Sequence, residues 1–106
     1  MAPVLFLLLA ILLEVAGTTS MKLAQGFTKP VPSVMIFVFY SLAFICLTFS
    51  LKRLDISVAY AIWSGVGTSL IVIIGFFYFH EPITAIQMGA LMLIIAGVVG
   101  LNLGTR

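Results

Sequence analysis

Four long apolar runs, separated by short polar stretches, dominate the pattern of hydrophobic and polar positions along the chain. They cover about residues 3–21, 33–51, 56–79 and 83–103. An α-helix rises about 1.5 Å per residue, so roughly 20 residues cross the hydrocarbon core of a bilayer. The runs are continuously apolar and do not alternate, as strands of a membrane barrel would. The pattern therefore predicts four transmembrane helices.

Three polar connectors separate these runs. The first, from Lys22 to Pro32, contains glycine and proline, and Ser33 after it is the predicted N-cap of the second helix. The second runs from Lys52 to Asp55, and the third is centred on His80-Glu81-Pro82. The first apolar run lacks a basic start and contains an acid, so we expect a retained helix and not a cleaved signal peptide.

Composition favours lipid as the solvent. Hydrophobic residues make up 63% of the chain and charged residues 8%, whereas a soluble domain carries about 25% charged residues. With connectors this short, we expect one transmembrane domain over residues 1–106. The sequence shows no metal-ligand cluster, nucleophile–base pair or phosphate-binding loop. We therefore expect neither an enzyme nor a cofactor, and five basic residues at helix ends do not indicate nucleic-acid binding.

Basic residues are almost balanced across the membrane. With four spans, both termini share a side with the middle connector, which places Lys52, Arg53 and Arg106 together, opposite Lys22 and Lys29. Three against two is a weak bias under the positive-inside rule. The balance predicts insertion in both directions, which would allow an antiparallel dimer. The alternative is one orientation set by the small excess.

Glu14 is the charge deepest within an apolar span. Ten apolar or small residues separate it from Pro3, and seven separate it from Lys22. A charge near the bilayer centre costs at least about 2.5 kcal/mol, and low-dielectric surroundings disfavour an ionised carboxylate. We therefore expect this carboxyl to hold a proton until a cation replaces it. The alternative is a packing role, with Glu14 bonded to a neighbouring hydroxyl.

Aromatic side chains lie at helical spacing inside two of the spans. The rings of Tyr40, Tyr60 and Trp63 offer π faces and polar tips to a flat or greasy cation. The alternative is that these stripes serve only packing. The second span carries Phe37, Tyr40, Ser41, Phe44 and Thr48 on one stripe, and the third carries Tyr60, Trp63, Ser64 and Gly67.

Small residues mark the third and fourth spans. Gly65 and Gly67 in the third weaken a helix interior and permit a bend, which is one route to alternating access. Close helix contact is the alternative. A small-residue face in the fourth span predicts a dimer contact, or packing against a helix of the same chain. It consists of Gly89, Ala90, Ala96, Gly97, Gly100 and Gly104.

Together, these segments resemble the small multidrug resistance family, specifically its branch that exports drugs and quaternary ammonium compounds. The resemblance covers essentially the whole chain. It is carried by EVAGTTSMK (residues 14–22), AYAIWSGVG (residues 59–67) and Glu81-Pro82. The branch is indicated by Ala16-Gly17-Thr18, because guanidinium exporters of the family tend to carry tryptophan close after the glutamate.

The resemblance implies an antiparallel homodimer of dual topology in a prokaryotic cell membrane, exporting hydrophobic cations in exchange for protons. Glu14 matches the residue at which substrate and proton compete, and Gly65 and Gly67 match a flexible segment. A guanidinium-type metabolite exporter, a subunit of a heteromeric pair and a passive channel are the alternatives. The binding chamber implied by the resemblance includes Tyr40, Tyr60, Trp63, Ala10, Ile11, Gly17, Thr18 and Ser64.

Overall fold

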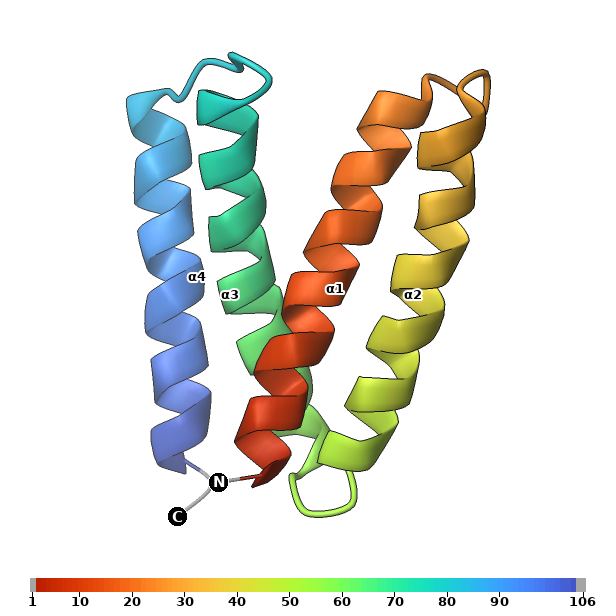
Figure 1. Cartoon of the computed structure of the whole chain (residues 1–106). Coiled ribbons are helices and arrows are strands. Elements are labelled where there is room, and N and C mark those ends of the chain that lie inside the picture. Colours follow the sequence, from red (N-terminus) through yellow and green to blue (C-terminus); the bar gives the residue numbers. More distant parts are fainter. Residues whose placement is uncertain (1, 105–106) are drawn as a thin grey trace. The chain divides into compact units, whose positions relative to one another are not determined.

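A computed structural model describes residues 2–104 of the chain (Figure 1). Within that range the chain forms four α-helices and no strand. They are α1 (Ala2–Ala24), α2 (Pro30–Ser50), α3 (Ile56–Phe77) and α4 (Ala85–Gly104). Each is long and apolar enough to cross a membrane. The all-α prediction of four transmembrane helices is confirmed.

The helices pair into two compact units, one built from α1 and α2 and the other from α3 and α4. Each unit is an antiparallel hairpin closed by a short connector (Figure 1). Two predictions concern how the hairpins assemble: that residues 1–106 form one domain, and that two chains form a dimer. Both remain predictions.

Small residues bring α1 and α2 close together. Leu7, Ala10 and Ile11 on α1 are fully buried, and Ala43 on α2 is also fully buried. At Gly17 an added Cβ would lie 2.7 Å from two carbons of the Tyr40 ring. The missing side chain at Gly17 therefore sets the distance at which the α2 aromatic lies against α1.

The start of α2 differs from the prediction. Ser33 is not the N-cap, because the helix begins three residues earlier at Pro30, with Lys29 in the extended N-cap conformation. Proline fits a first turn because the amides there have no acceptor within the helix. Pro30 and Pro32 thus open the helix and do not interrupt it. The Ser33 hydroxyl donates back to the Lys29 carbonyl at 2.5 Å.

The first connector is shorter than predicted because α1 continues to Ala24. The chain then turns through Gln25, Gly26 and Phe27, all with positive φ. The Ala24 carbonyl accepts the amides of Thr28 and Lys29 at 2.9 and 3.2 Å, which closes the helix end. These bonds satisfy a terminal carbonyl that water would otherwise have to solvate.

The connector of the second hairpin is longer than predicted, since α3 ends at Phe77 and α4 begins at Ala85. His80 has a φ of +58°, and the Glu81 amide donates to the Gly75 carbonyl at 2.9 Å. Thr84 and Gln87 form a reciprocal capping box: the Thr84 amide donates to Gln87 Oε1 at 2.9 Å and the Gln87 amide to Thr84 Oγ1 at 3.1 Å. This box fixes the start of α4.

Candidate cation and proton site

Glu14 lies near the middle of α1, half-buried, within a triangle of hydrogen-bonding oxygens. The Thr18 hydroxyl donates to Glu14 Oε2 at 2.6 Å. Thr18 Oγ1 and the Tyr40 hydroxyl lie 2.6 Å apart, and the Tyr40 hydroxyl lies 3.3 Å from the same carboxyl oxygen. One acid and two hydroxyls from two helices therefore meet at a single point.

Local helix geometry assembles this triangle. Thr18 follows Glu14 by four residues, so the two side chains share one face of α1. Tyr40 reaches them from α2 because Gly17 presents no side chain to its ring. The 2.6 Å distance from Thr18 to Glu14 lies in the range of charge-assisted O–H···O⁻ bonds. The Glu14 carboxyl is thus held by a short hydrogen bond from its own helix.

Two hydroxyl protons are available to this triangle, one on Thr18 and one on Tyr40. The Thr18 hydroxyl donates to Glu14 Oε2 at 2.6 Å, and the Tyr40 hydroxyl donates to the same oxygen at 3.3 Å. The two hydroxyls also lie within hydrogen-bond distance of each other, at 2.6 Å, where either can donate. One carboxyl oxygen is therefore the shared acceptor of hydroxyls from both helices.

Other predicted site residues of the first hairpin lie within one turn of the triangle along α1 and α2. Ala10 and Ile11 share the Glu14 face of α1 one turn earlier and are fully buried. Phe44 lies one turn beyond Tyr40 on α2, with ring centroids 5.9 Å apart and an interplanar angle of 57°. Phe44 is exposed. Tyr40 and Phe44 therefore present a continuous aromatic strip on α2, beside the carboxyl.

The predicted residues of the third span lie on α3, in the second hairpin. Tyr60 and Ser64 are exposed, Trp63 is half-buried, and the Ser64 hydroxyl donates to the Tyr60 carbonyl at 3.0 Å. Their shared face of α3 agrees with the spacing that singled them out. Their place in a common chamber with Glu14 remains a prediction.

The two predicted hinge glycines lie in the middle of an unbroken helix, since α3 runs continuously from Ile56 to Phe77. Both Gly65 and Gly67 are buried. A Cβ at Gly65 would lie 2.8 Å from Val98 Cγ2 on α4. Gly65 therefore has an immediate role in close α3–α4 contact, and the bend remains a prediction for both.

The small-residue face of α4 is uncovered within its hairpin. None of the α4 residues that the structure describes is buried. A Cβ at Gly89, Gly97, Gly100 or Gly104 would meet no atom within 4 Å, and Ala90 and Ala96 are exposed. Of these residues, Ala90 borders the hollow between α3 and α4. A role of this face in contact with a second chain remains a prediction.

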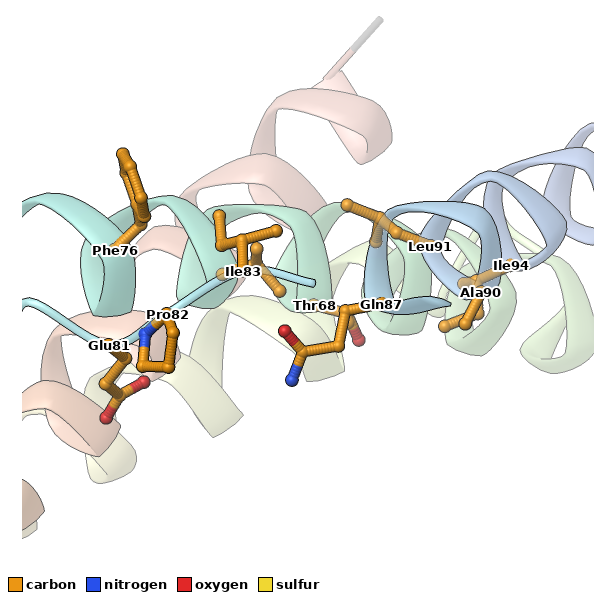
Figure 2. A pocket seen from close by; sticks show the side chains of 10 residues that line it. Thr68, Phe76, Glu81, Pro82, Ile83, Gln87, Ala90, Leu91 and Ile94 are labelled. Carbon is orange, nitrogen blue, oxygen red and sulfur yellow. The ribbon is translucent and has the colours of Figure 1, made fainter. Parts of the chain in front are cut away.

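A hollow of about 230 Å³ between α3 and α4 was not predicted (Figure 2). Glu81 borders it, and a Cβ on Gly75 would lie 2.5 Å from Glu81 Oε1. The sequence offered a partial signal in Glu81-Pro82 and in the Thr84–Gln87 spacing, but the hollow needs α3 and α4 side by side. Its lining consists of Thr68, Val72, Phe76, Glu81, Pro82, Ile83, Gln87, Ala90, Leu91 and Ile94.

Metal binding finds no support in residues 2–104, where no group of three or more histidine, cysteine, aspartate or glutamate side chains is placed to hold an ion. The Glu14 triangle itself offers a single charged oxygen donor with two neutral hydroxyls.

Known proteins are similar to this chain over nearly its whole length. A family profile described as Small Multidrug Resistance protein matches residues 2–94. The uncharacterized membrane protein YvaE of Bacillus subtilis (strain 168) is 54% identical over 98 residues, covering 92% of this chain and 82% of that protein. Multidrug resistance protein EbrB of the same organism is 50% identical over 102 residues, covering 96% and 87%.

A more distant relative extends the comparison beyond Bacillus. Quaternary ammonium compound-resistance protein QacE of Escherichia coli is 40% identical over 99 residues, covering 93% of this chain and 90% of that protein. Four helices able to span a membrane and a match of this extent agree with each other. The chain belongs to the small multidrug resistance family and is a multi-pass protein of the bacterial cell membrane.

Proposed function

We propose that the chain exports hydrophobic and quaternary ammonium cations in exchange for protons. The observation that carries this proposal is the Glu14 carboxyl in the middle of α1, bonded by Thr18 and Tyr40. The names of the relatives support it, because EbrB is a multidrug resistance protein and QacE a quaternary ammonium compound-resistance protein. The family is one of transporters and not of enzymes.

Exchange follows from the chemistry of a single carboxyl in lipid. A charge at this depth is unfavourable unless it is paired, so an ionised Glu14 attracts either a proton or a cationic substrate, and not both. Substrate binding from the cytoplasm displaces the proton, and a proton arriving from outside displaces the substrate. The aromatic faces of Tyr40 and Phe44 add cation–π attraction for the bound cation.

The proposed working unit is an antiparallel homodimer of dual topology, with two Glu14 carboxyls facing one chamber. Two nearby acids titrate as a pair, which couples both sites to the same substrate. Antiparallel symmetry makes the inward-facing and outward-facing states equal in energy without a gradient. Support comes from the uncovered small-residue face of α4 and from the near balance of basic residues in the connectors.

Transport by the purified chain in proteoliposomes tests the proposal. With an imposed proton gradient, wild type should accumulate tetraphenylphosphonium against its concentration gradient, and E14Q should abolish accumulation. D55N is the matched control, because it removes an acid at the N-cap of α3 and should retain transport. Uphill accumulation by E14Q would refute the mechanism.

The same vesicles separate the proposed activity from its alternatives. Proton movement driven by guanidinium, but not by tetraphenylphosphonium, would identify a guanidinium exporter. Loss of activity in the purified chain, restored only by a related second chain, would identify a heteromeric subunit. Flux without saturation or proton movement would identify a passive channel.

A further inference from the structure

A pocket of about 290 Å³ opens at the end of the α1–α2 hairpin that holds the start of α1 and the end of α2. Phe6 precedes Glu14 on α1, and Phe49 follows Tyr40 on α2, by about two helical turns each. The pocket combines aromatic and basic side chains, and none of its lining residues is acidic. The lining consists of Ala2, Pro3, Phe6, Phe49, Lys52 and Arg53.

Two phenylalanine rings form the apolar part of this pocket. The ring centroids of Phe6 and Phe49 lie 5.5 Å apart with an interplanar angle of 31°. The two side chains remain 39% and 49% exposed. The pair thus links the first turns of α1 to the last turn of α2, and it leaves an aromatic surface open at the end of the hairpin.

Two cationic side chains border the aromatic pair, on a backbone that is fixed by hydrogen bonds. The amides of Lys52 and Arg53 donate to the carbonyls of Phe49 and Ser50, each at 3.3 Å. Ser50 is fully buried, and its hydroxyl donates to the Leu47 carbonyl at 2.7 Å. The turn therefore continues the end of α2, and both basic residues start from defined positions.

We infer that this pocket binds an anionic phospholipid, with the headgroup phosphate at Lys52 and Arg53 and the upper acyl chain over Phe6 and Phe49. Charge complementarity selects the occupant. Two cations at the end of two apolar spans lie at headgroup depth, where basic pockets between helices bind anionic lipid headgroups. Arginine offers paired N–H donors to phosphate, and lysine adds a second positive charge. The inference does not depend on the transport mechanism.

Lipid titration tests this assignment with the full-length protein in a neutral detergent. Short-chain phosphatidylglycerol and phosphatidylcholine, both below their micellar concentrations, are compared by calorimetry. Each basic residue near an anionic headgroup contributes roughly fivefold in affinity. We therefore expect wild type to prefer phosphatidylglycerol about 20- to 30-fold, a preference that falls as salt screens the charges.

Variants distinguish lipid binding in this pocket from general attraction of the lipid to positive charge. K52Q/R53Q should lose the preference, and K52R/R53K should keep it. The matched control, K22Q/K29Q, removes two charges from the other end of the hairpin. Because the pocket is lined by residues of a single hairpin, this variant should bind phosphatidylglycerol as wild type does, whichever way the chain was inserted. F6A should weaken the binding of both lipids while retaining the preference for phosphatidylglycerol. Circular dichroism verifies that each variant remains helical.

Three results would overturn the inference. The first is an unchanged preference in K52Q/R53Q, and the second is an equal loss in K22Q/K29Q. The third is binding of inorganic phosphate as tight as that of phosphatidylglycerol and lost in K52Q/R53Q, which would indicate a simple anion site. Transport failure in E14Q affects none of these measurements, so this inference and the proposed function fail separately.

Discussion

Thr18 links the acid of α1 to the aromatic strip of α2, since its single hydroxyl donates to Glu14 and lies 2.6 Å from the Tyr40 hydroxyl. A methyl group in place of this hydroxyl would remove its hydrogen bonds to the Glu14 carboxyl and to Tyr40. Hydrogen bonds to charged groups contribute about 1.5–3 kcal/mol. Thr18 should therefore contribute to cation binding at Glu14, although it carries no charge itself.

We predict that T18V weakens binding of tetraphenylphosphonium about 10- to 100-fold, because ionised Glu14 loses its shortest hydrogen bond. T18S should bind as wild type does. T19V is the matched control, since the Thr19 hydroxyl donates only to the Val15 carbonyl of its own helix, at 2.9 Å. Equilibrium binding in detergent checks the prediction, and equal losses in T18V and T19V would contradict it.

In both hairpins, a neighbouring side chain occupies the space beside a helix glycine where a Cβ would otherwise lie. Gly17 accommodates the Tyr40 ring, Gly65 accommodates Val98, and Gly75 accommodates the Glu81 carboxylate. Small residues permit such approach in lipid, where van der Waals packing drives much of the association between helices. Gly65 therefore has two candidate roles, contact and hinge, and a compensating substitution on α4 distinguishes them.

G65A places a Cβ 2.8 Å from Val98 Cγ2, so we predict that the free energy of unfolding falls by about 1–3 kcal/mol and that transport is reduced. If contact is the role, G65A/V98A should recover both properties, because the shortened side chain at residue 98 removes the clash. Stability recovered without transport would assign Gly65 to a bend as well. No recovery of either property would contradict the contact.

The sequence predicted the helices well, because a continuous apolar run of bilayer length must satisfy its backbone hydrogen bonds within the lipid, and a helix does so internally. The four-residue spacing of Glu14 and Thr18 is enough to place both on one face of α1. The sequence missed the start of α2, since Pro30 and Pro32 serve both as loop residues and as first-turn residues. The Tyr40 contact and the α3–α4 hollow depend on packing between helices, which periodicity within one helix does not report.

At the scale of the whole molecule, few charges determine which way the chain is inserted. The connectors and the C-terminal Arg106 present three basic residues on one side and two on the other. Topology follows this count in short loops, and acidic residues contribute little. If the chain inserts in both directions, as proposed, a change of two or three charges should convert the mixture of orientations into a single one.

We predict that K22Q/K29Q inserts in one orientation, since it leaves three basic residues against none, and that K52Q/R53Q/R106Q inserts in the opposite one, with none against two. Each variant alone would form no antiparallel dimer and should lose resistance to quaternary ammonium compounds. Co-expression should restore resistance, because the two oppositely inserted chains can then pair. Labelling of single cysteines introduced into the connectors, with the native Cys46 replaced, reports each orientation. Full resistance from one variant whose labelling shows a single orientation would mean that transport needs no antiparallel partner.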